Sequence, residues 1–261
     1  MEFIFFLLLF LSVYSYFIYP LVMAIWPKKP LRYPEAQSTP KVSLIITARN
    51  EEKRLREKLE DCLKMDYPSH SLEILIASDC SDDATDEIVM EYSGKGVRLV
   101  RALERRGKEY AQSLAIDVAT GDIIIFSDVA TRMDSDAFKA IAREFGSPEV
   151  GAVSSEDRFI SQDGSVAGEG LYVRYEMKLR QMESEVNSIV GMSGSFFAVR
   201  KEVAQYNWDI FSPSDFNCAI NCYQLGMRAV SSKQVFGYYK DISNPSKEYE
   251  RKIRTVVRGM T

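Results

Sequence analysis

The sequence is poor in the residues that build metal centres and histidine-based active sites. It contains a single histidine, His70, and four cysteines, none of which form a C-x-x-C pair. One histidine excludes Ser-His-Asp triads and zinc sites made of several histidines. The cysteine spacing argues against structural zinc and favours reduced thiols in a cytosolic domain. A formal net charge of −4 disfavours nucleic acid as a partner.

Phosphate-binding glycine loops are also missing. The segment 42–52 (VSLIITARNEE) closes an apolar strand and begins a helix, yet it contains neither G-x-G-x-x-G nor G-K-[ST]. A nicotinamide-dependent oxidoreductase is therefore disfavoured. Without such a loop, a bound diphosphate needs a metal ion or basic side chains to offset its charge.

The first residues form a long apolar run. Phe3 to Ile25 contains no charged residue, and roughly 20 residues suffice to cross a bilayer as a helix. Glu2 is the one charge before this run, and the positive-inside rule applies to the basic residues that follow it, Lys28, Lys29 and Arg32. We therefore predict a single-pass protein of the inner cell membrane with its domain in the cytoplasm. A cleaved signal peptide is the alternative, disfavoured because a basic n-region is missing.

After a transmembrane helix over residues 1–27 and a proline-rich linker over 28–40, strands and helices alternate. Apolar runs predict strands at residues 42–47, 72–77, 97–100, 122–127, 150–154, 195–199 and 227–235. Helical periodicity predicts helices over 50–65, 109–120, 171–186 and 215–225, and one through Ile88 and Val89 that Asp82 and Asp83 cap.

This alternation indicates right-handed βαβ units and an α/β domain with a mostly parallel, doubly covered sheet. We expect one domain over residues 41–261. Its nucleotide-binding half would be 41–131, and its acceptor-side half 132–261.

Three carboxylates stand at the ends of these elements. Asp79 and Asp128 each close an apolar strand, and Asp215 stands at the head of a helix. In an open α/β sheet, ligands bind where the strands end. We therefore expect the three aspartates to share one site.

Seven short motifs occur in this order: TARNEE at 47–52, SDCSDDAT at 78–85, Gly107-Lys108, SDVAT at 127–131, GMSGSFFAVR at 191–200, PSDF at 213–216 and RKIRT at 251–255. Together they resemble the inverting family 2 glycosyltransferases of GT-A (Rossmann-like) fold, in particular the membrane-anchored, processive-type members. The resemblance covers nearly all of the chain after residue 41.

The resemblance implies a role for each matching residue. Asp215 corresponds to the general base that takes the acceptor's proton, while positive charge stabilises the leaving nucleoside diphosphate. Asp128 corresponds to the metal-binding aspartate. The nucleotide-binding positions are Thr47, Arg49, Glu51, Asp79, Lys108 and Asp128. Arg251 and Arg254 correspond to a clamp on the diphosphate or the acceptor.

Each role has a simpler alternative. Asp215 is also a suitable helix N-cap, and Asp79 is also suited to cap the acidic turn that follows it. Lys108 and Glu51 each stand near the start of a predicted helix, where lysine and glutamate side chains are usually solvated. The arginines of the C-terminal segment share one helical face, which is equally suited to an anionic membrane surface.

The chain departs from the family pattern at two positions and in length. Ala130 replaces the second aspartate of D-x-D, so a divalent cation (Mn²⁺ or Mg²⁺) would be weakly bound through Asp128, the diphosphate and water. Thr255 replaces a tryptophan, and the sequence ends at Thr261, earlier than we expect for relatives with such a leader.

The sequence leaves two candidate functions. The first is a membrane-tethered enzyme that transfers a sugar from a UDP-linked donor to a lipid-linked or polysaccharide acceptor. The second is a non-catalytic or truncated subunit that binds nucleotide sugar or assembles with other membrane subunits of a polysaccharide synthase.

Overall fold

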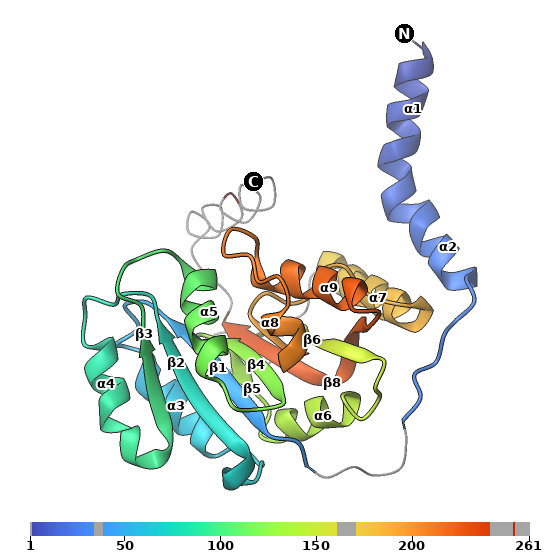
Figure 1. Cartoon of the computed structure of the whole chain (residues 1–261). Helices are drawn as coiled ribbons and strands as arrows, with labels where there is room; N and C mark the ends of the chain where they lie inside the picture. The colour runs from blue at the N-terminus through green and yellow to red at the C-terminus, as the bar shows by residue number, and fades with distance from the viewer. Residues whose placement is uncertain (1, 34–38, 161–170, 241–252, 254–261) are drawn as a thin grey trace.

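The computed structural model describes residues 2–33, 39–160, 171–240 and 253 (Figure 1). Its first part is a helix of three consecutive segments, α1 (Glu2–Val13), a π-helical turn (Tyr14–Ile18) and α2 (Tyr19–Ile25). The helix ends at Trp26, whose backbone is extended (φ −66°, ψ 143°), because a residue before a proline is biased away from helical angles. By length and composition, with 24 residues and a mean hydropathy of 2.0, it is able to cross a membrane.

The domain is built on one mixed sheet. Among the described residues, eight strands lie in the order β3-β2-β1-β4-β7-β6-β8-β5. Their bounds are β1 Val42–Ala48, β2 Leu72–Ser78, β3 Val97–Arg101, β4 Ile123–Asp128, β5 Arg132–Met133, β6 Val150–Ile160, β7 Phe196–Arg200 and β8 Arg228–Lys240. Strands β1 to β4 pair in parallel, β7 runs antiparallel between β4 and β6, and β6 pairs in parallel with β8. The predicted α/β fold with a mostly parallel sheet is confirmed.

Helices cover both faces of the sheet (Figure 1). One face is packed by α3 (Leu55–Leu63), α4 (Thr85–Glu91) and α6 (Ala137–Glu144). The other is packed by α5 (Lys108–Val118), α8 (Lys201–Gln205) and α9 (Ser214–Gln224). Helix α7 (Leu171–Val186) contacts both α2 and β8.

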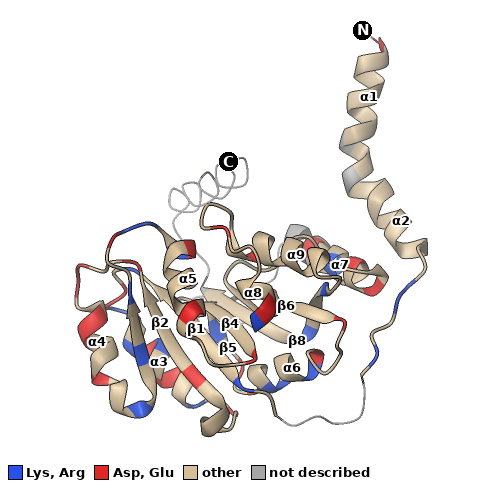
Figure 2. Ribbon diagram, viewed as in Figure 1, with Lys and Arg blue, Asp and Glu red and all other residues tan. Residues whose placement is uncertain are grey.

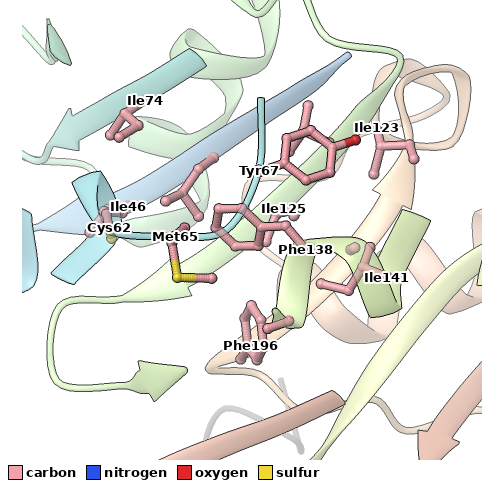
Figure 3. Close-up of a cluster of buried hydrophobic side chains, with 14 of the residues drawn as sticks. Ile46, Cys62, Met65, Tyr67, Ile74, Ile123, Ile125, Phe138, Ile141 and Phe196 are labelled. Atoms are coloured by element: carbon pink, nitrogen blue, oxygen red, sulfur yellow. The ribbon is translucent and has the colours of Figure 1, made fainter. Parts of the chain in front are cut away.

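Alternate side chains of each strand supply two separate apolar cores, because successive strand residues point to opposite faces. Ile46 and Ile125 pack with Phe138 and Ile141 of α6 in the first core, which Figure 3 shows. Ile45 belongs to the second core, together with residues of α5 and α9. The central strands are therefore buried on both sides and hold the site at their carboxyl ends rigidly.

The structure differs from the sequence-based expectation in several elements. Helices α6 and α8 were not expected, because eight and five residues give little room for a helical period to show. The first helix of the domain, α3, begins at Leu55 and not at Asn50, because Asn50 has a left-handed backbone (φ 54°) after β1. Strands β6 and β8 run on to Ile160 and Lys240, where backbone pairing continues through residues with polar side chains.

The described part of the predicted linker has no regular secondary structure and lies against the domain. Lys29 donates its backbone N–H to the Glu185 carbonyl at 2.8 Å, and Arg228 Nη1 donates to the Lys29 carbonyl at 2.9 Å. The Tyr33 hydroxyl donates to Glu144 Oε2 at 2.7 Å. These bonds attach the chain that follows the N-terminal helix to residues of α6, α7 and β8.

Candidate active site

The carboxyl ends of three adjacent strands meet at one edge of the sheet. In the register of β1 with its two neighbours, Thr47 lies opposite Ala77 of β2 and opposite Asp128 of β4. Asp79 follows β2 directly. The sequence predicted that Asp79 and Asp128 lie close together because each closes an apolar strand. The sheet order β2-β1-β4 brings them to the same edge.

Asp79 is buried and bonded to the backbone. Its side chain is 4% exposed, and Oδ1 accepts hydrogen bonds from the N–H groups of Arg106 and Gly107, each at 3.1 Å. Gly107 has φ 101°, a left-handed angle that favours glycine, immediately before α5. Asp79 therefore positions the turn that presents Lys108 to the site.

Arg49 joins the turns after β1 and β2. Its Nη1 donates to the carbonyls of Asp79 (2.8 Å) and Cys80 (2.9 Å). Cys80 has φ 55°, an angle suited to the glycine that the family motif places there. In the described structure the Arg49 guanidinium therefore stabilises a strained turn.

Thr47 and Glu51 have different surroundings. The Thr47 hydroxyl is buried and has no hydrogen-bond partner among the described residues, which is uncommon for a buried polar group. The Glu51 carboxylate pairs with Arg54 at 2.7 Å, and its backbone N–H donates to Thr85 Oγ1 at 2.8 Å. Thr47 therefore offers an unused hydroxyl at the site, whereas Glu51 has local partners.

Lys108 lies at the centre of the site. Its Nζ donates to Asp128 Oδ1 at 2.7 Å and to the Gly194 carbonyl at 2.8 Å. An ammonium has three N–H donors, so these bonds use two of them. The Lys108 side chain is 23% exposed, so its charge remains accessible to a ligand that enters from solvent.

Asp215 stands at the start of α9 beside this group. Its neighbour there is Gly194, whose carbonyl accepts a hydrogen bond from Lys108. A Cβ atom placed on Gly194 would lie 3.4 Å from Asp215 Oδ1, so the two residues are close neighbours. Burial raises the pKa of Asp215, while its own N–H, the charge of Lys108 and the N–H of Phe216 lower it. Pro213 holds the N-cap position of α9, so the N-cap alternative for Asp215 is wrong. Asp215 lies in the first turn of the helix, near Gly194 and within range of the Lys108 charge.

Lys58 is a site residue that the sequence did not single out. This lysine is 4% exposed, and its Nζ donates to Ser127 Oγ at 2.8 Å and to the Thr131 carbonyl at 2.6 Å. Burial lowers the pKa of Lys58, and the charges of Cys62 and Asp128 raise it. The available signal was its helical spacing, because Lys58 shares a face with the buried Leu55 and Cys62. Its bonds fix the turn that contains Asp128.

A second unexpected group lies on β6 and β8. The Tyr239 hydroxyl donates to Asp157 Oδ1 at 3.2 Å and lies 3.3 Å from Ser193 Oγ. Burial raises the pKa of Asp157. Burial and the charges of Asp157 and Asp128 raise the pKa of Tyr239. Sequence analysis missed this group because Asp157 and Tyr239 lie in the polar ends of strands whose apolar parts alone gave a signal.

Two predicted site residues lie outside the described residues. Arg251 and Arg254 fall there, as do Thr255 and, apart from Ile253, the rest of the predicted basic C-terminal helix. Their proposed contact with a diphosphate or an acceptor therefore stays a prediction.

The residues present do not form a metal centre by themselves. Within the described ranges, no group of three His, Cys, Asp or Glu side chains is placed to hold a metal ion. Asp128 is the one carboxylate at the predicted position, Ala130 supplies no ligand, and Lys108 already bonds Asp128 Oδ1. Since a hard divalent cation takes six or more oxygen ligands, a resident metal held by this protein alone does not fit the site.

The comparisons with known proteins point in one direction. The family described as "Glycosyl transferase family 2" matches residues 43–208. The probable glycosyltransferase YdaM of Bacillus subtilis is 25% identical over 199 residues, which cover 72% of this chain and 47% of that protein. A dolichyl-phosphate beta-glucosyltransferase of Drosophila melanogaster is 32% identical over 112 residues, 38% of this chain and 34% of that one. The chain thus spans about half or less of the length of these relatives.

Solved structures agree on the fold. Mannosyltransferase PcManGT from Pyrobaculum calidifontis, in complex with GDP-Man and Mn²⁺, superposes with a TM-score of 0.73 at 23% identity and covers 91% of this chain and 69% of its own. Residues 1–349 of S. aureus TarS, in complex with UDP-GlcNAc, give a TM-score of 0.58 at 18% identity, over 78% of this chain and 59% of that one. Because the family match covers more than half of the sequence and the sheet order agrees with a GT-A fold, this chain belongs to glycosyl transferase family 2.

Proposed function

We propose that this chain transfers a sugar from a nucleotide donor, with UDP as the first candidate, to an acceptor at the cytoplasmic face of the inner membrane. The observation that supports this most directly is that Lys108 bonds both Asp128 and the Gly194 carbonyl, and that Asp215 lies beside Gly194. It brings a carboxylate suited to accept a proton next to an ammonium suited to a diphosphate.

In the proposed reaction, an acceptor hydroxyl attacks the anomeric carbon from the face opposite the diphosphate. The new C–O bond forms as the bond to the diphosphate oxygen breaks, so the anomeric configuration inverts. The acceptor's proton passes to an Asp215 carboxylate oxygen. The electron pair of the broken bond stays on the diphosphate, where the Lys108 ammonium and, as predicted from sequence, Arg251 and Arg254 would stabilise the charge.

The donor assignment draws on similar proteins and on the site. TarS was solved with UDP-GlcNAc and PcManGT with GDP-Man and Mn²⁺. In this chain, the Lys108 side chain is 23% exposed and available to a nucleotide diphosphate, and the Thr47 hydroxyl, opposite Asp128 in the strand register, is buried without a described partner. A divalent cation arriving with the donor would find one carboxylate, Asp128, and otherwise phosphate oxygens and water.

Membrane tethering is supported by the N-terminal helix. Figure 2 shows α1 and α2 without charge after Glu2 at the start of α1, and basic residues in the chain that follows. Two glutamates of α7 hold this helix and the chain that follows it: Glu185 pairs with Lys28 at 2.5 Å, and Glu183 Oε1 accepts from the Tyr19 hydroxyl at 2.8 Å. The positive-inside rule then assigns the domain to the cytoplasm.

A UDP-release assay tests this function. Membrane-extracted full-length chain is offered a panel of nucleotide sugars with extracted membrane lipids or glycans as acceptors, and Asp215→Asn serves as the matched variant. We expect release with at least one donor in the wild type, and intact donor binding without release in Asp215→Asn. Donor binding with no turnover in either protein would instead support the non-catalytic subunit, which Ala130 favours.

A further inference from the structure

Helix α9 has an exposed face made of large apolar side chains. Phe216, Ile220 and Tyr223 recur at i, i+4 and i+7 and are 43%, 37% and 79% exposed. The opposite face is buried in the second core through Cys218 and Cys222. Asp215 is the one charged residue of α9. The exposed face of this helix is therefore apolar and uncharged beyond its first turn.

Two further exposed apolar residues lie in segments that precede α9 in the chain or pack in the same core as α9. Phe211, just before α9, is 84% exposed, and Val190 is 62% exposed. The neighbours of Val190 in sequence, Ile189 and Met192, pack in the same core cluster as Cys218 of α9. We call Val190, Phe211, Phe216, Ile220 and Tyr223 the α9 apolar surface. Soluble proteins rarely leave such groups in water without a partner.

The N-terminal helix shows on which side a membrane would lie. Tyr175 of α7 donates to the Tyr16 carbonyl at 3.1 Å, and the two tyrosine rings lie 6.2 Å apart. Helix α7 then leads directly into the segment that contains Val190. In Figure 1, α1 and α2 rise beyond the end of the domain where α7 and α9 lie.

The charges around α7 match an anionic leaflet. Arg174 and Lys178 are exposed and one helical turn apart. Lys28 and Lys29 follow the apolar helix. The acidic groups of α7 have described partners, because Glu176 pairs with Arg180 at 2.6 Å, Glu183 accepts from Tyr19, and Glu185 pairs with Lys28. Exposed basic residues beside an apolar surface are typical of proteins that bind anionic membranes.

We propose that the α9 apolar surface is a second membrane contact, whose partner is the anionic lipid bilayer that holds the N-terminal helix. Because Asp215 begins the same helix, this contact holds the site at the bilayer surface. The acceptor is then a lipid-linked hydroxyl that stays in the membrane and not a free glycan. This choice of acceptor rests on the proposed function, whereas the membrane contact rests on α9 alone.

Depth-dependent fluorescence tests the contact. A Tyr223→Cys variant of the full chain is labelled with an environment-sensitive fluorophore and placed in nanodiscs of phosphatidylcholine and phosphatidylglycerol. Met90→Cys, also an exposed apolar position but on α4 across the sheet, is the matched control. Labelled wild-type chain sets the background from Cys80. We expect lipids with a doxyl group on the acyl chain to quench the label at position 223 and not at position 90.

Equal quenching at both positions would overturn the contact. A blue-shifted label at position 223 that the doxyl lipids do not quench would also overturn it. That shift would indicate a second copy of the chain if it depends on protein concentration, or another segment of the same chain if it does not.

A turnover measurement tests the acceptor. The triple variant Phe216→Ser, Ile220→Ser, Tyr223→Ser is compared with Met90→Ser in nanodiscs that contain extracted membrane lipids as acceptors. We expect the triple variant to lose about tenfold in turnover with UDP affinity unchanged, and Met90→Ser to match the wild type. Unchanged turnover in the triple variant would reject the lipid-linked acceptor. Absence of turnover in the wild type would reject the proposed function and leave the quenching result standing.

Discussion

The ammonium of Lys108 lies 2.7 Å from Oδ1 of Asp128, where the family pattern has its metal-binding aspartate. Lys108 also bonds the Gly194 carbonyl at 2.8 Å, so it joins the end of β4 to the segment before β7. In the proposed function, this fixed positive charge meets the diphosphate of the donor. This arrangement leads to predictions about charge, metal and proton transfer.

Replacement of this charge should weaken donor binding. In Lys108→Met we expect UDP affinity to fall about 10- to 100-fold, because a charge-assisted hydrogen bond is lost and the Asp128 carboxylate is left to repel the diphosphate. Isothermal titration calorimetry measures this directly. Lys64→Met, at an exposed lysine after α3, is the control. Equal affinities in the two variants would remove Lys108 from the donor site.

Metal removal should affect this protein little. With one carboxylate at the position of D-x-D, we expect the UDP affinity of the wild type to change by less than about tenfold when EDTA replaces Mn²⁺. Ala130 is exposed, so an aspartate there fits without a burial cost. In Ala130→Asp, we expect Mn²⁺ to strengthen UDP binding more than it does in the wild type. A wild type that loses all UDP affinity in EDTA would contradict this view of the site.

The Thr47 hydroxyl gives a test in which stability and binding change in opposite directions. Since this buried hydroxyl has no described partner, Thr47→Val should keep or slightly raise the melting temperature. If the hydroxyl bonds the donor, the same variant should lose about fivefold in UDP affinity. Thr85 is the matched control, because its buried Oγ1 donates to Asp83 and accepts from the Glu51 N–H. Thr85→Val should therefore lower the melting temperature, and thermal unfolding with and without UDP separates the two cases.

The sequence predicted best those elements that are buried on both faces. Strands β1, β2 and β4 are covered on both faces, so their residues are continuous apolar runs, and the aspartates at their ends were placed correctly. The contacts of those aspartates were not predictable. Whether Asp79 binds the N–H groups of residues 106 and 107 depends on a turn far along the chain.

Other residues of the candidate site lie where the sequence shows no apolar pattern that predicts their position. Asp157 and Tyr239 meet because β6 and β8 pair beyond their apolar halves, and single-sequence periodicity does not report pairing between polar segments. Lys58 resembled any solvated helix lysine until the fold placed it beneath the Asp128 turn. The motif resemblance identified residue positions, and tertiary structure determined their partners.

Asp215 should show the pH dependence of a buried general base. A base acts in its deprotonated form, and burial raises the pKa of Asp215, so turnover should rise with pH through a range above the usual titration of an aspartate. The Lys108 charge lowers this pKa, and Lys108→Met should therefore move the acidic limb of kcat to higher pH. A pH profile of UDP release measures both effects, and an unmoved limb in Lys108→Met would separate the two residues.

Replacement of Asp215 by asparagine should separate activity from stability. In Asp215→Asn we expect turnover to fall roughly 10²- to 10⁴-fold, the usual contribution of a general base. A carboxyl whose folded pKa is raised stabilises the fold at low pH and loses that contribution as pH rises through its folded pKa. At neutral pH the neutral amide avoids the cost of a buried charge, so the variant should melt at or above the wild-type temperature. If instead the variant unfolds earlier at neutral pH, the hydrogen bonds that the carboxylate accepts from the N–H groups of Asp215 and Phe216 outweigh the cost of its burial, and its main role is structural.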